Sequence, residues 1–195
     1  SSGCVMHTED STVAHFTSRQ FMAFVTAIAL SGGVFGDVLD AAPHGFTVRY
    51  TVTVDANRLE VYEAAVANIG KWWSSDHTVS GDAANLYMVT TMPGCFCESL
   101  GNGSGLVHMT VSFLNPGVMV RLTGGLGPLG LGGVTGNMTW EFDETEGGTA
   151  VTLQYVVGGY MNGGLDVVAP AVDSGLVEAM NRLKAFAETG NPEQG

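Results

Sequence analysis

The chain has 195 residues, of which 45% are apolar and only 13% charged, so it can bury one sizeable core and suits a single domain. Seven Lys and Arg residues against 19 Asp and Glu residues give a formal net charge of -12. This charge repels phosphate backbones and anionic lipid surfaces. We therefore expect neither nucleic-acid binding nor stable insertion of the domain into a membrane.

Residues 1 to 45 are expected to form an N-terminal tail. Within it, the apolar run from Phe21 to Leu30 follows Arg19 and precedes small residues through Gly36, which is typical of an export signal. The run is too short to span a bilayer. If the segment 19–36 is an export signal, the protein is periplasmic or secreted. Otherwise it is cytoplasmic, and the run is a helix or a tail packed on the domain.

The domain begins with a predicted strand over residues 46 to 54, where inward Val and Tyr alternate with outward Thr and Arg. Asn57 is a suitable N-cap for a short helix that ends near Gly70. Six further strands are predicted, joined mostly by short turns, at Leu86 to Thr91, Cys95 to Leu100, Ser104 to Asn115, Val118 to Gly124, Val134 to Asp143 and Thr149 to Val157.

The last predicted element is an amphipathic helix of about five turns from Val168 to Phe186, with its apolar residues on one stripe. Pro170 is tolerated in the first turn, where no backbone hydrogen bond is lost. Gly190 is placed to end the helix, which leaves residues 190 to 195 as a C-terminal tail.

The order of strand, short helix, six strands and long helix predicts an α+β fold over residues 46 to 189. We expect a curved, seven-stranded antiparallel sheet that wraps around the C-terminal helix. Such an arrangement leaves an apolar cavity between the sheet and the helix.

This order, the segment Lys71-Trp72-Trp73 and the helical segment from Leu183 to Ala187 resemble the helix-grip superfamily, SRPBCC. The superfamily includes START lipid-transfer domains, polyketide cyclases and pollen-allergen-like proteins. The string from Trp72 to Leu86, followed by Gly94 to Glu98, is similar to one bacterial subgroup. The resemblance covers residues 46 to 189 and implies binding of a hydrophobic or amphipathic small molecule between sheet and helix. It implies no single reaction, because members include carriers, cyclases and co-chaperone ATPase activators.

Two tryptophans, Trp72 and Trp73, stand beside Asp76 and His77, a mixture of aromatic and polar residues that is typical of ligand pockets. We expect these four residues to contact a ligand. The alternative is that the indoles pack in the core and that Asp76 caps a loop.

Cys95 and Cys97 are two residues apart in a predicted strand, so both side chains share one face. Such positions usually fit disulfide geometry poorly, and we expect two buried thiols. The alternative, in an oxidising compartment, is a disulfide between them. Together with His77 and His108 the cysteines lack the paired spacing of a structural zinc site. We expect neither a metal nor a cofactor.

Polar residues within the strands are further candidates for ligand contact. If Arg121 faces the cavity, it could hold a carboxylate or an enolate oxygen; if it faces outward, it is a surface charge. The same two alternatives hold for Glu98 and His108. Trp140 and Tyr155, on the strands that follow, are also counted among the candidate ligand contacts.

The glycine-rich segment from Gly124 to Gly133 lacks the Lys-Ser/Thr pair of a phosphate-binding loop. Its leucines, including Leu126 and Leu129, could cover the mouth of the cavity as a lid. The alternative is an ordinary apolar hairpin tip. Tyr160 lies between two glycine pairs before the last helix and could add a hydroxyl at the mouth.

These features favour a non-enzymatic carrier or sensor of a hydrophobic small molecule. One alternative is an enzyme similar to polyketide cyclases, with His77 or His108 as the base and Arg121 stabilising an enolate. The other is a protein-binding module similar to the ATPase activators, which would need a continuous exposed apolar patch on the sheet.

Overall fold

A computed structural model of the chain describes residues 35–194, which belong to the unit Gly32–Gly195. Except for its last two positions, the predicted export segment at residues 19–36 lies outside the described residues. None of the helices within residues 35–194 is both long and apolar enough to cross a bilayer.

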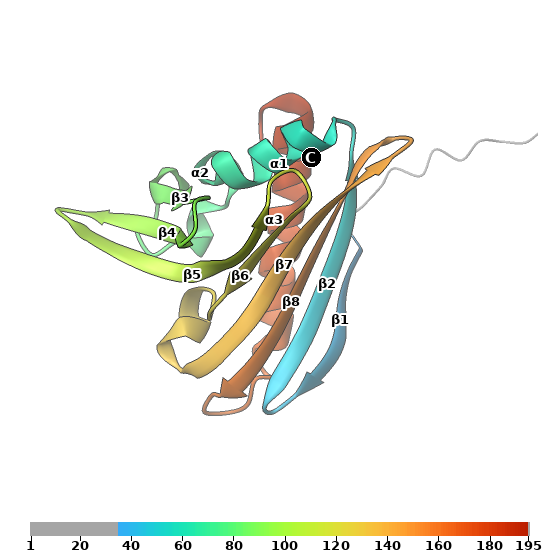
Figure 1. Cartoon of the computed structure of the whole chain (residues 1–195). Coiled ribbons are helices and arrows are strands. Elements are labelled where there is room, and N and C mark those ends of the chain that lie inside the picture. Colours follow the sequence, from blue (N-terminus) through green and yellow to red (C-terminus); the bar gives the residue numbers. More distant parts are fainter. Residues whose placement is uncertain (1–34, 195) are drawn as a thin grey trace, which may run out of the picture. The chain divides into compact units, whose positions relative to one another are not determined.

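Strands dominate the described chain, and one long helix closes it (Figure 1). In chain order the elements are β1 (Phe35–Ala42), β2 (Gly45–Val54), α1 (Arg58–Ala67), α2 (Ile69–Trp72), η1 (Ser75–His77), η2 (Ala83–Asn85), β3 (Leu86–Met88), β4 (Gly94–Gly101), β5 (Ser104–Asn115), β6 (Met119–Thr123), η3 (Gly127–Leu131), β7 (Gly133–Thr145), β8 (Gly148–Tyr160) and α3 (Ala169–Thr189), where η marks a short 3-10 helix.

The strands form where apolar and polar residues alternate, as predicted. Every second residue of β2 from Phe46 to Val54 is buried. The hairpin between β4 and β5 turns at Asn102 and Gly103, whose φ angles of 52° and 81° suit a two-residue turn that matches the twist of the strands.

The strands form one antiparallel sheet in the order β1-β2-β8-β7-β6-β5-β4-β3. The prediction of seven strands is wrong by one, because β1 pairs with β2 along the edge of the sheet within the range expected to be a tail. Its register shifts between Val38 and Asp40, so Leu39 interrupts the alternation of side chains. A strand of this kind lacks the two-residue alternation of apolar and polar residues from which strands are predicted.

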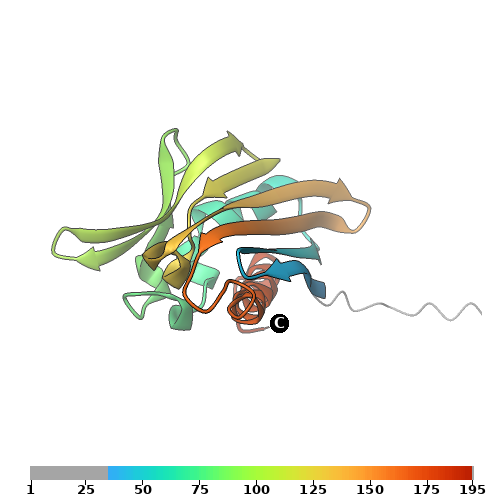
Figure 2. The same ribbon diagram turned by 90° about the horizontal axis from the view of Figure 1, so that it is seen from below.

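The long helix α3 lies against one face of the curved sheet (Figures 1 and 2). Pro170 stands in its first turn, and Gly190 ends it in the left-handed region with φ 78°, as predicted. The stripe that includes Leu176, Met180 and Leu183 is buried. The α+β architecture with a C-terminal helix therefore agrees with the helix-grip fold that the resemblance implies.

Polar contacts fix α3 to β2. The Tyr50 hydroxyl donates a hydrogen bond to Asp173 Oδ1 at 2.7 Å, and Lys184 Nζ donates one to the Thr53 carbonyl at 2.7 Å. Burial of the Tyr50 hydroxyl, with its hydrogen bond to the Asp173 carboxylate, raises the pKa of Tyr50. The tyrosine therefore stays protonated as a donor.

The predicted first helix is two helices, α1 and α2, with a break at Asn68. Asn57 caps α1 as predicted, since its Oδ1 accepts a hydrogen bond from the Glu60 N–H at 3.0 Å. At the other end, Arg182 of α3 donates from Nε to the Trp72 carbonyl at 2.7 Å. This bond satisfies a carbonyl that the helix end leaves free and ties the tryptophan segment to α3.

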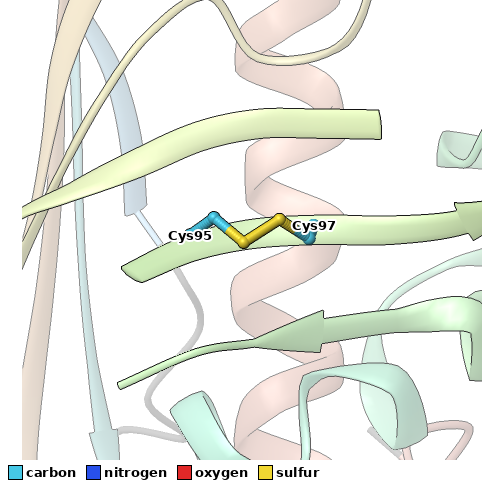
Figure 3. Close-up of a disulfide and its surroundings, with 2 residues drawn as sticks. All are labelled: Cys95 and Cys97. Atoms are coloured by element: carbon cyan, nitrogen blue, oxygen red, sulfur yellow. A yellow bond between two sulfur atoms is a disulfide. The ribbon is translucent and has the colours of Figure 1, made fainter. Parts of the chain in front are cut away.

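Cys95 and Cys97 form a disulfide on β4 (Figure 3). The prediction of two thiols is therefore wrong. Their Cα atoms lie 5.5 Å apart, within the range that disulfides span, whereas two steps along a straight strand cover about 6.6 Å. The pair lies where the ladder between β4 and β5 shifts register, next to Phe96. Local alternation alone could not reveal this shift.

Candidate ligand cavity

A cavity of about 890 Å³ opens between the N-terminal half of α3 and the part of the sheet formed by β4 and β5. Its other walls include the segment 73–79, the end of β6 with the loop 124–131 that contains η3, the start of β7, and Met161 after β8. Elements from both ends of the domain therefore meet around it.

Most of the cavity wall is apolar. The apolar side chains that line it are Trp73, Val79, Phe96, Leu106, Val107, Met109, Leu126, Pro128, Leu129, Leu131, Val134, Met161, Val168, Ala171, Val172 and Leu176. Polar side chains are fewer, namely Asp76, His77, Thr78, His108, Thr110, Thr123 and Thr135. An apolar wall with a small number of polar groups is the usual composition of a small-molecule site.

A β-bulge shapes the sheet side of the cavity. Phe96 of β4 lies opposite Met109 of β5, but the next residue of β4 lies opposite Val107, so His108 is an extra residue in β5. A bulge bends its strand and changes the direction of a side chain. The bulge thus supplies the curvature of the wall and places His108 in it.

His108, in this wall, forms a buried pair with Glu98, which stands behind it. His108 Nε2 lies 2.9 Å from Glu98 Oε2, and the two side chains are 4% and 0% exposed. The carboxylate also accepts hydrogen bonds from the backbone N–H groups of Val79, at 3.1 Å, and Ser80. Through these bonds, Glu98 of the sheet holds residues 79 and 80, at the end of the segment that lines the cavity.

These hydrogen bonds set the charge of Glu98. Burial alone would favour the neutral acid, but hydrogen bonds from Ser80, from the Val79 N–H and from His108 outweigh it and lower the pKa of Glu98 to about 2. Glu98 is therefore a carboxylate at neutral pH, and a carboxylate accepts hydrogen bonds without donating any.

A second pair lies at the mouth of the cavity. His77 Nε2 lies 3.0 Å from Glu178 Oε2 of α3, and both side chains are nearly half exposed. Partial burial would raise the pKa of Glu178, but hydrogen bonds from Ser74 and His77 and the charges of His77 and Arg182 lower it. Gly175 of α3 packs next to this imidazole, since a Cβ there would lie at an ordinary contact distance of 3.5 Å from the ring.

The loop before η3 is held by a tyrosine from β8. The Tyr155 hydroxyl donates to the Gly124 carbonyl and accepts from the Leu126 N–H, each at 3.0 Å. Burial raises the pKa of Tyr155, although the hydrogen bond from Leu126 opposes this. Gly125 packs so closely on Gly130 that a Cβ would lie 2.8 Å from its nitrogen. The loop is therefore compact and fixed at its base.

Half of the predicted ligand contacts line this cavity, namely Trp73, Asp76, His77, His108, Leu126 and Leu129. Two of the others stand directly behind the lining: Glu98 holds His108, and Tyr155 holds the η3 loop.

The remaining four candidates lie elsewhere. Trp72 and Trp140 pack in the core with ring centroids 6.0 Å apart, and Trp72 Nε1 donates to the Ala64 carbonyl. Tyr160 is 75% exposed and is not in the lining. Arg121 alternates with buried residues of β6, so it points away from α3, and its Nε donates to Thr139 Oγ1 at 3.2 Å.

Lining residues outside the predicted ligand contacts come mainly from α3 and β5, including Val172, Gly175, Leu176 and Met109. Val172 and Leu176 belong to the apolar stripe of the predicted helix, where the sequence indicates packing. Periodicity identifies such a stripe but does not separate residues that touch the sheet from residues that face a cavity. Among residues 35–194, no three His, Cys, Asp or Glu side chains converge to hold a metal ion.

Neither a family model nor a curated protein matches this chain, whereas solved structures share its fold. EF2215 from Enterococcus faecalis, a conserved protein of unknown function, is 11% identical, with 80% of each chain covered and a TM-score of 0.55. CalU16 from Micromonospora echinospora is 15% identical, with 84% of this chain and 88% of that chain covered and a TM-score of 0.55. SSP2350 from Staphylococcus saprophyticus is 18% identical, with 76% and 96% covered and a TM-score of 0.52. At these identities the likeness shows the fold alone.

Proposed function

We propose that this protein binds a hydrophobic or amphipathic small molecule in the cavity between the sheet and α3, as a carrier or sensor. The observation that carries the proposal is the cavity itself, whose volume of about 890 Å³ lies within the range of sites for small organic ligands. Its mainly apolar wall would gain free energy by exchanging water for an apolar ligand.

The η3 loop is the proposed lid. Leu131 is 92% exposed, and Leu126 and Leu129 of the same loop line the cavity. With its base fixed by Tyr155, the outer part of the loop can move while the wall keeps its place.

An enzyme that acts on the same ligand is the second candidate, because His77 and His108 line one cavity. Arg121 has no part in this alternative, since it lies on the opposite face of the sheet. The resemblance to a bacterial SRPBCC subgroup is compatible with either candidate.

A protein-binding module is less well supported. The outward positions of β2 and β7 carry mainly polar residues, such as Arg49, Thr51, Thr53, Asn137 and Thr139. Several of them bond across strands, as Thr51 does with Thr152. Along β2 and β7 the outward rows are therefore polar, whereas such a module needs a continuous apolar patch.

Export is also part of the proposal, and the Cys95–Cys97 disulfide supports it. Disulfides persist in oxidising compartments and are rare in the cytosol. The periplasm or the exterior is therefore the proposed location.

Native mass spectrometry of gently purified protein beside a denatured sample tests the proposal by detecting a co-purifying small molecule. After removal of that molecule, titration calorimetry with 2-methylnaphthalene measures binding of a purely apolar probe. Ala171→Trp places an indole in the cavity and should abolish binding, because Ala171 is exposed to the cavity from α3. Ser174→Trp, on the same helix but outside the lining, is the matched control. Equal binding by both variants would refute the proposed site.

A further inference from the structure

The lining of the cavity contains a carboxylate but no lysine or arginine side chain. Asp76 of η1 belongs to the lining and is exposed, so a molecule in the cavity can reach it. An exposed aspartate is ionised at neutral pH. None of the lysine and arginine side chains within residues 35–194 lines the cavity. The permanent charge of the described wall is therefore negative.

No cationic side chain of the described chain forms an ion pair with this carboxylate. None of the ion pairs within residues 35–194 includes Asp76. Arg182, which approaches the same segment from α3, has other partners: its Nε donates to the Trp72 carbonyl at 2.7 Å, and its Nη1 lies 2.6 Å from Glu193 Oε1. The charge of Asp76 is therefore available to a bound molecule.

A second carboxylate adds to the negative potential next to Asp76. Glu178 of α3 lies 3.0 Å from Nε2 of His77, the residue that follows Asp76. Partial burial opposes ionisation, but hydrogen bonds from Ser74 and His77 lower the pKa of Glu178, so this group is also a carboxylate at neutral pH. The net charge of -12 has the same sign, and such a field attracts cations and repels anions. An anionic ligand would meet repulsion here without gaining a cationic partner.

We propose that the ligand of this cavity is an amphiphile with a positively charged end, a protonated amine on an apolar body, and that this charge pairs with Asp76. The apolar body lies against the wall formed by Trp73 and Phe96, whose ring centroids are 5.6 Å apart. A charge pair that is partly shielded from water is stronger than one in bulk solvent. The inference rests on the proposed binding function and adds the chemical class of the polar end of the ligand.

Three probes with the same apolar body test this inference: 2-(aminomethyl)naphthalene, a cation at neutral pH; 2-naphthoate, an anion; and the uncharged 2-methylnaphthalene. Titration calorimetry on the full-length protein gives their dissociation constants. The cation should bind at least about fivefold more tightly than the anion, because one ion pair at contact distance contributes about this factor even in bulk water. Equal affinities for the two ions would overturn the inference, while binding of 2-methylnaphthalene would leave the proposed function intact. Failure of all three probes to bind would overturn both.

Asp76→Asn removes the charge and keeps the shape of the side chain. The affinity for the cation, relative to that for 2-methylnaphthalene, should fall about fivefold. Glu63→Gln is the matched control, since it removes the same charge from an exposed position on α1 outside the lining, and it should leave this ratio unchanged. An unchanged ratio in Asp76→Asn, or the same fall in both variants, would overturn the inference.

The salt dependence of binding to the wild-type protein requires no variant to fold. Salt screens the interaction between exposed charges. Relative to 2-methylnaphthalene, the affinity for 2-(aminomethyl)naphthalene should therefore fall as sodium chloride is added, and the affinity for 2-naphthoate should rise. A relative affinity for the cation that does not depend on salt would overturn the inference.

Discussion

Replacing Glu98 by Gln should remove a large part of the acid sensitivity of this protein. The folded state lowers the pKa of Glu98 from an ordinary value of 4.5 to about 2. A group with a depressed pKa in the folded state stabilises the fold above its unfolded pKa, and this stabilisation is lost as the pH falls towards the folded value. The whole difference corresponds to about 3 kcal/mol, of which about 2 kcal/mol is lost between pH 5.5 and pH 3.

The assay is urea unfolding of wild type and Glu98→Gln at several pH values in that window. The difference in unfolding free energy between the two proteins isolates Glu98 from the other carboxylates. We expect this difference to shrink by about 2 kcal/mol from pH 5.5 to pH 3. Glu63→Gln, an exposed position on α1, should change stability by less than about 0.5 kcal/mol at either pH. A difference that stays constant with pH would refute the assignment of Glu98 as a buried, hydrogen-bonded carboxylate.

Three further changes test single features of the structure. Tyr155→Phe removes the hydroxyl that bridges an N–H and a carbonyl of the η3 loop. The free energy of unfolding should fall by about 1–3 kcal/mol. Hydrogen exchange in that loop, measured by mass spectrometry, should become faster. The double change Cys95→Ser and Cys97→Ser opens a ring of only three residues. Because the unfolded chain gains little entropy from this, the free energy of unfolding should fall by only about 1–2 kcal/mol. The melting temperature measured by calorimetry should fall by about 3–6 °C. Asn57→Ala removes the side-chain cap of α1, so the free energy of unfolding measured in urea should fall by about 1 kcal/mol.

Each of these changes has an outcome that contradicts its reasoning. Tyr50→Phe is the control for Tyr155→Phe, since the Tyr50 hydroxyl hydrogen-bonds to Asp173 of α3 and not to the η3 loop. Faster hydrogen exchange of the η3 loop in both variants would mean that Tyr155 does not hold this loop specifically. A loss well above about 3 kcal/mol in the cysteine variant would show that the disulfide constrains more than its own turn. An unchanged stability in Asn57→Ala would mean that solvent replaces the cap without cost.

Several parts of the fold could be predicted because their signals are local. The strand over Ser104–Asn115 has the predicted bounds, and Asn57, Pro170 and Gly190 mark helix ends as expected. Caps, turns and alternation depend on neighbours in the chain, so a single sequence contains them.

Other features could not be predicted because they depend on contacts distant in sequence. The edge strand β1 is a strand through its pairing with β2, and the disulfide forms where the ladder of β4 and β5 shifts. A one-residue shift exchanges inward and outward positions, and no local period reveals where it occurs. For the same reason, the sequence does not decide whether Arg121 faces inward or outward on β6, where the structure places it outward.

By itself, the sequence determined the α+β class, the order of most elements and the presence of a polar and aromatic segment at Trp73, Asp76 and His77, because composition and periodicity decide which residues must be buried. Only the tertiary structure decided that these residues face His108 across an apolar cavity and that Glu98 stands behind that histidine. The physical reason is that a cavity is defined by atoms from separate elements. Sheet curvature, a bulge and the docking of a helix bring these elements together, and none of these three features is a property of one segment.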